Sequence, residues 1–347
     1  MIRRIAIIGA GVVIVAAAIL AAAVLRSVYT RPTVPGPEAE SLLFTIASGE
    51  SFASVTARLS DRGMIRSRLA VKVYAWIRRY DRRIKAGTYS IPPGDTPHDI
   101  LGRFVHGDIY RVSVTVPEGL MHKEIAGVLA KEADIDSTSF ALLSSDPAVL
   151  EKLGVDAPSL EGYLFPDTYV VPWAMAPIDA AGMMVRRLDE VYDGAMRERA
   201  RAIGMSRREV LTLASIVQAE TRLPEELPLV AAVYHNRLRR GMRLEADPTV
   251  AYAMGGYRGR LYFKDLEIDS PYNTYRYPGL PPGPICSPGE AAINATLYPD
   301  STCRAIYFVA EGGGGHIFSL TLKEHLSAVQ KVRKSKAARK SGSQSEQ

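Results

Sequence analysis

The sequence is poor in cysteine, with only Cys286 and Cys303 among 347 residues. Outside the cytoplasm these two could pair, because a separation of 17 residues would close a modest loop. Two buried free thiols are the alternative. Neither cysteine lies beside a His and Asp constellation in the sequence, so chemistry at a thiol is not expected.

Two further absences concern ligands. The chain has no His, Asp and Cys spacing typical of metal sites and no glycine-rich phosphate loop, so neither a metal nor another cofactor is expected. It also lacks a base-reading motif. The formal net charge is +6, but the segment from Lys331 onward contains six basic residues and only one acidic residue, Glu346. The rest of the chain is therefore close to neutral, which argues against nucleic-acid binding and predicts a basic disordered tail over 331–347.

The sequence does contain one long apolar run, near its beginning. Ile5–Leu25 is an uncharged stretch of about 21 residues, which as a helix spans roughly 30 Å and can cross a bilayer once. We expect residues 1–29 to form a cytoplasmic stub and a single anchor in the cytoplasmic (inner) membrane. Arg3 and Arg4 precede the run and Arg26 and Arg31 follow it; the amino terminus adds positive charge to the near side and so favours placing the bulk of the chain outside the cytoplasm. A cleaved signal peptide is the alternative, although its apolar region is usually only about 7–15 residues long.

Beyond a proline-rich segment, 30–41, which predicts a stiff linker, the sequence repeats itself. Phe44–Leu59 aligns with Val114–Leu129 at a constant offset of 70, and Tyr89–Phe104 is a fainter copy. Each copy predicts a strand, a glycine turn and an amphipathic helix. This order is similar to LysM-type modules, which hold N-acetylated sugar chains. We expect a LysM-like βα module over 42–110 and a second repeat-like segment with a connector over 111–158, although any βα unit needs such glycines.

The helix expected before Pro224 carries the main catalytic candidate. Ser206 followed by Glu209 predicts a capped helix start, and the apolar positions that follow recur at helical spacing up to Glu220. A carboxyl group on such a face is partly desolvated, which raises its pKa and suits a general acid. The alternative is that Glu220 is the solvated end of the helix.

Other polar residues downstream are candidates for substrate binding. Asp247 precedes Pro248, so it is expected first of all as a helix N-cap with proline at the next position. The stretch Ser270–Gly289 is too stiff and too aromatic for a simple linker and predicts a rigid carbohydrate-facing wall. The candidate substrate-binding residues are Asn236, Asp247, Tyr272, Asn273, Tyr275 and His316.

Five motifs between Leu160 and Lys323 carry a resemblance: LEGYLFPDTY, ASIVQAET, NRLRRGMRLEADPTV, YNTYRYPGLPPGPI and YFVAEGGGGHIFS. In this order, and after a membrane anchor, they resemble the endolytic murein transglycosylases of the YceG-like (MltG) class. The resemblance implies a mixed α/β catalytic domain over 159–330, within an α+β protein, and places the catalytic glutamate at Glu220. A family position often held by a second acid is Gln218 here.

By this resemblance, the chain cleaves the bond between N-acetylmuramic acid and N-acetylglucosamine within nascent peptidoglycan strands. It would leave 1,6-anhydro ends, terminate strand elongation and work near the penicillin-binding synthases. One carboxyl group suffices, because the sugar's own 6-hydroxyl replaces water. Two alternatives stay open: a hydrolytic muramidase with Asp247 as second carboxylate, and a non-enzymatic peptidoglycan-binding or division scaffold.

Overall fold

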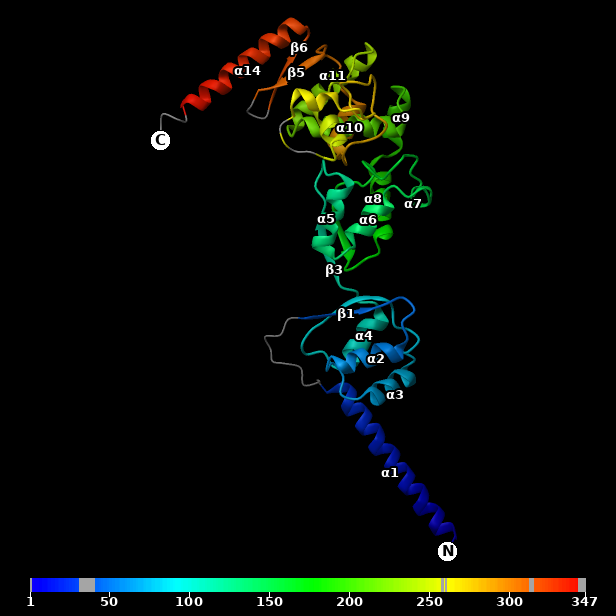
Figure 1. Ribbon diagram of the computed structural model, residues 1–347. Helices are drawn as coiled ribbons and strands as arrows, with labels where there is room; N and C mark the ends of the chain where they lie inside the picture. The colour runs from blue at the N-terminus through cyan, green and yellow to red at the C-terminus, as the bar shows by residue number, and fades with distance from the viewer. Residues whose placement is uncertain (1, 31–40, 257–258, 260, 312–314, 343–347) are drawn as a thin grey trace. The chain divides into compact units, whose positions relative to one another are not determined.

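The computed structural model describes residues 2–30, 41–256, 259, 261–311 and 315–342 (Figure 1). The chain forms two compact units. Unit 1 comprises Met1–Val112 with Val170–Met175, and unit 2 comprises Ser113–Tyr169 with Ala176–Gln347. Helices and strands are mixed throughout, and the described strands form three two-stranded sheets, so the fold is of the α+β class. The expected linker 30–41 lies almost wholly outside the described residues.

Unit 1 is a small layer of helices on a two-stranded sheet. Strands β1 (Leu42–Ile46) and β2 (Gly87–Ile91) pair antiparallel, with Phe44 opposite Tyr89. These two rings meet the ring of Phe104 in the core. The helices are α1 (Ile2–Tyr29), α2 (Phe52–Asp61), α3 (Arg68–Arg78) and α4 (Pro97–His106).

The repeat found in the sequence has a backbone counterpart. The first copy forms β1 and α2, the faint copy forms β2 and α4, and the other forms β3 (Arg111–Thr115) and α5 (His122–Ala133). Gly49 and Gly119 occupy equivalent turns with φ of 77° and 78°, a conformation that favours glycine. The strand, turn and helix order is therefore confirmed, whereas the likeness to LysM modules stays a prediction.

Helix α1 is the expected apolar helix, and its segment Ile7–Tyr29 is long and apolar enough to cross a membrane. Its last turn belongs to unit 1. Val28 is fully buried and Val24 packs beside it in the core that holds β1 and β2. The hydroxyl groups of Tyr29 and Tyr74 on α3 lie 3.1 Å apart.

The first part of unit 2 contains α5, α6 (Ser137–Leu143), α7 (Pro147–Lys152) and α8 (Pro177–Val191). Strand β4 (Thr168–Pro172) pairs with β3. Helix α8 ends before Asp193 and α9 (Gly194–Ala202) begins after it, because Asp193 is extended and its side chain accepts a hydrogen bond from Met196 N as a new N-cap.

The second part of unit 2 is a helical core around α10 (Arg207–Glu220). Helices α11 (Leu227–Arg239) and α13 (Glu290–Leu297) pack against α10, with short α12 (Asp247–Ala253) nearby. Two 3₁₀ turns, Pro224–Glu226 and Phe263–Glu267, complete the helical segments.

A small antiparallel sheet and a helix end unit 2. Strands β5 (Tyr307–Ala310) and β6 (His316–Ser319) pair, and α14 (Leu322–Gly342) packs on them. The prediction of a disordered tail from 331 was wrong for 331–342, because α14 continues through it. Val332 is buried there, and Lys, Arg and Ala, which dominate this stretch, favour a helix.

Candidate active site

Helix α10 delivers Glu220 at its last residue. The predicted capping box forms, since Ser206 Oγ accepts from Glu209 N while the Glu209 carboxylate accepts from Ser206 N. Residues 210–217 are all buried, which fixes α10 in the core. The backbone leaves the helix at Thr221, with φ of −136° and ψ of 146°. Glu220 is thus held by a rigid element, and its carboxyl group is half-buried rather than a solvated end.

The carboxyl group of Glu220 has one close hydrogen-bond partner. The hydroxyl group of Tyr234 on α11, itself buried, donates to Glu220 Oε1 at 2.6 Å. Burial raises the pKa of Glu220 to about 7; the Tyr234 hydrogen bond and the charge of Arg237 oppose the rise, and the negative charge of Asp247 adds to it. Glu220 therefore holds a proton in a large share of molecules at neutral pH.

The cation near Glu220 is the guanidinium group of Arg237, and its hydrogen bonds go to other groups. Arg237 is buried, and its guanidinium group donates to the carbonyl oxygens of Ile306 and Leu244, each at 2.7 Å, and to Glu245 at 3.1 Å. It also lies over the ring of Tyr307. Its charge reaches Glu220 through space, but its hydrogen bonds hold β5 and the segment before α12 in place.

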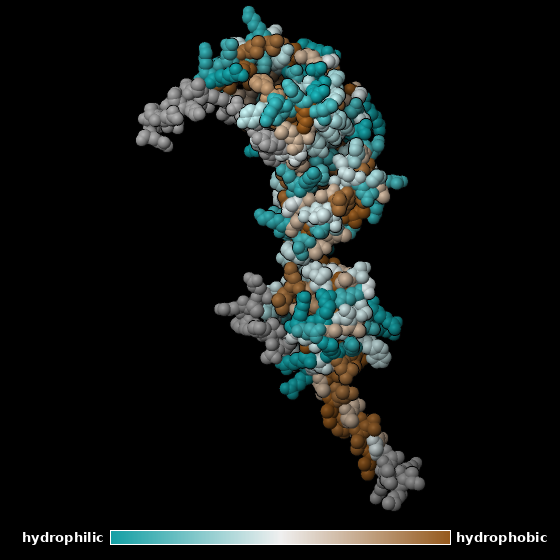
Figure 2. Space-filling view, viewed as in Figure 1, coloured by the Kyte–Doolittle hydropathy of each residue, from teal (hydrophilic) through white to brown (hydrophobic). Residues whose placement is uncertain are grey.

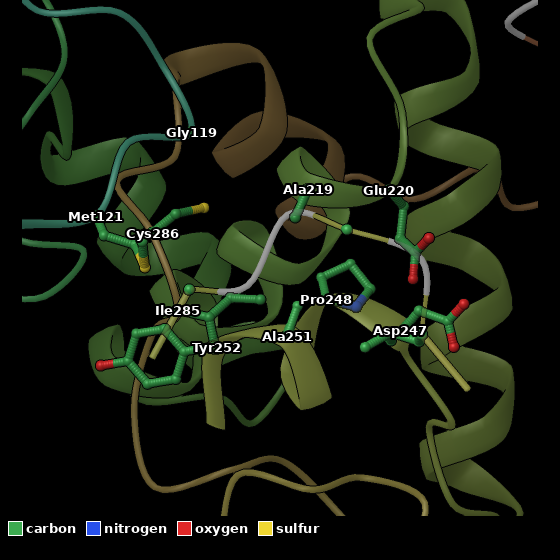
Figure 3. A pocket seen from close by; sticks show the side chains of 13 residues that line it. Gly119, Met121, Ala219, Glu220, Asp247, Pro248, Ala251, Tyr252, Ile285 and Cys286 are labelled. Atoms are coloured by element: carbon green, nitrogen blue, oxygen red, sulfur yellow. The ribbon is translucent and has the colours of Figure 1, made fainter. Parts of the chain in front are cut away.

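Asp247 is not the helix cap that the sequence predicted. The N-cap of α12 is Ala246, without a side-chain cap, and Asp247 is the first helical residue. Its carboxylate instead accepts from the hydroxyl group of Tyr275 at 2.6 Å. Figure 3 shows the side chains of Asp247 and Glu220 at the same end of a cavity. The structure therefore places a second carboxyl group near Glu220, at a residue that the sequence offered as a helix cap and also as a candidate substrate contact.

Two cavities meet at these carboxyl groups. The first, of about 660 Å³, runs from Glu220 and Asp247 past Ala251 to Tyr252, Ile285 and Cys286 (Figure 3). The second, of about 440 Å³, begins at the same two carboxyl groups and continues past Tyr275 to Phe308 and His316. Glu220 thus lies between two hollows, an arrangement that suits a ligand extending to both sides of the reacting bond.

The walls of the first cavity depend on the motif LEGYLFPDTY. Gly162 has φ of 77°, and a side chain there would clash with Pro284, so only glycine lets this segment approach the wall formed by Ile285 and Cys286. Gln218 also supports this wall, because its side-chain oxygen accepts from Gly289 N at 3.0 Å. Neither cysteine is in a disulfide.

Beyond the carboxyl pair, His316 is fixed in the second cavity. Its Nδ1 and its backbone N bond the carboxylate of Glu226 at 2.6 and 2.8 Å, and both side chains are largely buried. These hydrogen bonds lower the pKa of Glu226 against the effect of burial. With Nδ1 engaged, Nε2 is the ring nitrogen left for a ligand.

The structure separates the other candidates from this cluster. The side-chain amide of Asn236 donates to the carbonyl oxygens of Cys303 and Ala305, and that of Asn273 to those of Leu266 and Ile268. Their side-chain oxygens accept from Arg239 and from Tyr275 N. All of these contacts position loops. The ring of Tyr272 packs against the ring of Tyr252, which lines the first cavity, with centroids 4.8 Å apart.

Sequence reasoning missed several residues of the site. Tyr234, Arg237 and Glu226 gave no local signal for their bonds to Glu220, Ile306 and His316, because these three partners lie 14, 69 and 90 residues away in the chain. A buried pair, Glu161 and His122, was also missed; Glu161 is 1% exposed and adjoins Tyr252. Among the described residues, no group of His, Cys, Asp or Glu is arranged to hold a metal ion.

Comparisons with known proteins agree on one family. The model of the YceG-like family matches residues 44–331. The chain is 32% identical over 310 residues to an endolytic murein transglycosylase of Bacillus subtilis, covering 84% of each protein. It is 28% identical over 308 residues to one of Streptococcus pneumoniae R6, of which it spans 55%. A crystal structure of a YceG-like protein from Listeria monocytogenes superposes with a TM-score of 0.58 at 29% identity, covering 83% of this chain and 98% of that one. With its matched motifs and this coverage, the chain belongs to the YceG-like family.

Proposed function

We propose that this chain is a membrane-anchored lytic transglycosylase that cuts within nascent peptidoglycan strands. The bond cleaved joins N-acetylmuramic acid to N-acetylglucosamine, and the product carries a 1,6-anhydro end that terminates strand elongation. The observation that carries the proposal is Glu220, a carboxyl group with a pKa of about 7 at the junction of two cavities. Its relatives named as murein transglycosylases support the same reaction.

The geometry suits a proton cycle at one residue. Tyr234 donates to Oε1 of Glu220, which leaves Oε2 to carry the proton. In the first step this proton passes to the glycosidic oxygen as the bond from C1 of the muramic sugar breaks. In the second, the carboxylate accepts the proton of the 6-hydroxyl group while O6 bonds to C1. Tyr234 stabilises the transient carboxylate between the steps, and no water is consumed.

The residues around Glu220 divide into contacts and supports. We propose Asp247, Tyr275 and His316 as substrate contacts, because each lines a cavity that Glu220 also lines. Asn236, Asn273 and Tyr272 act as supports of the walls, since their contacts described above lie within the protein. The strand would then lie across Glu220 with sugars in both cavities.

The test is a digestion of purified peptidoglycan with the full chain in detergent, followed by mass analysis of the products. We expect 1,6-anhydro ends from the natural chain and no cleavage by Glu220→Gln. If both proteins bind glycan and neither cleaves it, the chain is a scaffold and the proposal fails.

A hydrolytic muramidase is the second candidate, because Asp247 lines the same two cavities as Glu220, the proposed general acid. Such enzymes need a second carboxylate as nucleophile or base. Asp247→Asn separates the two: a transglycosylase loses one substrate contact but still cuts and keeps its 1,6-anhydro ends, whereas a muramidase loses cleavage. Reducing ends in the products of the natural chain would favour the muramidase directly.

The location and the partners belong to the same proposal. Helix α1 would hold the chain in the cytoplasmic membrane with the bulk outside, where the penicillin-binding synthases make new strands. Unit 1 has a β1–α2–α3–β2 order, which is the support for a LysM-like role in holding glycan. Retention of the full chain, but not of a variant with β1 and α2 altered, on insoluble peptidoglycan would test that role.

A further inference from the structure

Helix α3 of unit 1 presents an apolar face to its surroundings. Its inner face buries Ala70, Val71, Tyr74 and Ala75. Its outer face exposes Leu69, Trp76 and Ile77 by 72%, 72% and 63%, and Val73 by 36%. Single exposed apolar residues are ordinary, but four large ones at helical spacing on one face indicate a contact surface.

Basic residues surround this face. Between Arg66 and Lys85 the sequence has eight basic residues and one acid, Asp81. Arg68 pairs with Asp61 of α2, whereas Lys72 lies exposed on the outer side of α3 itself and Arg82 and Arg83 lie exposed just after it. An exposed apolar face with tryptophan, bordered by lysine and arginine, is the composition of helices that lie in a membrane interface.

The position of α3 relative to α1 decides what can cover the face. The C-terminal turn of α1 packs directly on α3 and α4, through Val28 in the core and Tyr29 against Tyr74 and His98. The apolar segment of α1 reaches Tyr29, so the segment that can cross a membrane ends inside unit 1, with no connecting chain between them. In Figure 2 the hydrophobic surface of α1 continues up to its junction with this unit.

We propose that α3 lies in the outer headgroup layer of the bilayer that α1 crosses, with Leu69, Val73, Trp76 and Ile77 directed toward the acyl chains. Lys72, Arg82 and Arg83 then meet lipid phosphates, a contact that anionic lipids strengthen. The occupant of the face is the phospholipid bilayer. This rests on one part of the proposed function, the insertion of α1, and is independent of the chemistry at Glu220.

Tryptophan fluorescence tests the proposal in the full chain. The chain has two tryptophans, so Trp173→Phe leaves Trp76 as the only reporter. The variant is placed in nanodiscs of phosphatidylethanolamine and phosphatidylglycerol, with and without bromine on the acyl chains. Interfacial helices sit about 5–10 Å into the boundary of headgroups and acyl chains, so we expect blue-shifted Trp76 emission, quenched most by bromines high on the chain. The matched control, Trp76→Phe, reports Trp173, which packs on Tyr110 and should keep its intensity.

Two results would overturn the inference. Emission of Trp76 that is water-like and unaffected by bromine means that the face is solvated. Blue-shifted emission without quenching means that protein, such as a second copy, covers it. Release of the chain from membranes by alkaline carbonate would instead show that α1 does not span, which is a failure of the anchoring proposal.

Substitution adds a second, independent measurement. Leu69→Ser with Ile77→Ser, made beside the Trp76 reporter, should lower the quenching, because both side chains are exposed and their loss spares the core. Leu142→Ser is the matched control, since Leu142 on α6 in unit 2 is 73% exposed and should leave the quenching unchanged. Equal quenching in all three proteins would contradict insertion of this face.

Discussion

Two carboxyl groups of unit 2, Glu161 and Glu220, are both shielded from water but differ in their partners. Glu161 is almost fully buried and accepts from the backbone N and the Nδ1 of His122, at 3.0 and 2.7 Å. Glu220 has one neutral donor, Tyr234, and a like charge at Asp247 nearby. The hydrogen bonds of buried Glu161 connect two segments of the fold. At Glu220 a single hydrogen bond does not offset the cost of burying the charge, so this carboxyl group keeps its proton to higher pH.

The same isosteric change at both sites gives the sharpest test of this contrast. Glu220→Gln removes the proposed proton carrier and should lower the rate of strand cleavage by about 10²–10⁴-fold, the usual range for a general acid or base. Glu161→Gln should keep cleavage and the same product ends. Mass analysis of timed digests measures both. Equal losses of the cleavage rate in the two variants would contradict the assignment of a catalytic role to Glu220 and a structural role to Glu161.

The stability of the two variants should change in opposite directions. The folded-state pKa of Glu220, about 7, exceeds the ordinary glutamate value of 4.5, so the folded chain binds more protons than the unfolded chain and wild-type stability falls as pH rises from about 4.5 to 7. Glu220→Gln removes this penalty. Its free energy of unfolding should exceed that of the wild type by about 2–3 kcal/mol at pH 8 and match it at pH 4. Denaturant titrations at both values measure this, and a gain at pH 4 alone would contradict it.

For Glu161→Gln we expect a loss of stability instead. The new amide group presents a donor to a group that now donates to Glu161, and leaving a buried polar group unsatisfied costs about 1–3 kcal/mol. Urea unfolding at neutral pH is the measurement. His122→Gln is the companion variant and should lose a similar amount. An unchanged urea midpoint in both variants would show that the pair of Glu161 and His122 does not contribute to stability.

The smallest expected effects are shifts of the pH profile. In the proposed mechanism cleavage needs protonated Glu220, so activity should fall as pH rises through about 7. Tyr234→Phe removes the hydrogen bond that lowers this pKa and should move the alkaline limb to higher pH. Asp247→Asn removes the charge that raises it and should move the limb to lower pH, each by about one unit. Movement in the same direction would contradict the assigned causes.

The sequence allowed prediction of features whose partners are close along the chain. The capping box of Ser206 and Glu209 spans three residues, and α10 with Glu220 at its end followed from it. The glycine turns of the repeat were equally local. By contrast, Asp247 bonds Tyr275 across 28 residues and Glu161 bonds His122 across 39. From the sequence, Asp247 is explained by a local role as the N-cap of a helix. Only the fold shows that its carboxylate instead accepts a hydrogen bond from the distant Tyr275.

The burial of Val28 in unit 1 has a practical consequence for preparing the protein without its apolar helix. A fragment that begins after residue 30 loses this side chain from the core, which costs about 1.5–3 kcal/mol of burial and exposes the apolar surface beneath it. A fragment that begins at Val24 keeps both Val24 and Val28. The fragment that begins after residue 30 should aggregate more readily than the one that begins at Val24, for reasons unrelated to membranes or catalysis. The first residue of a soluble fragment therefore decides whether it represents the whole chain fairly.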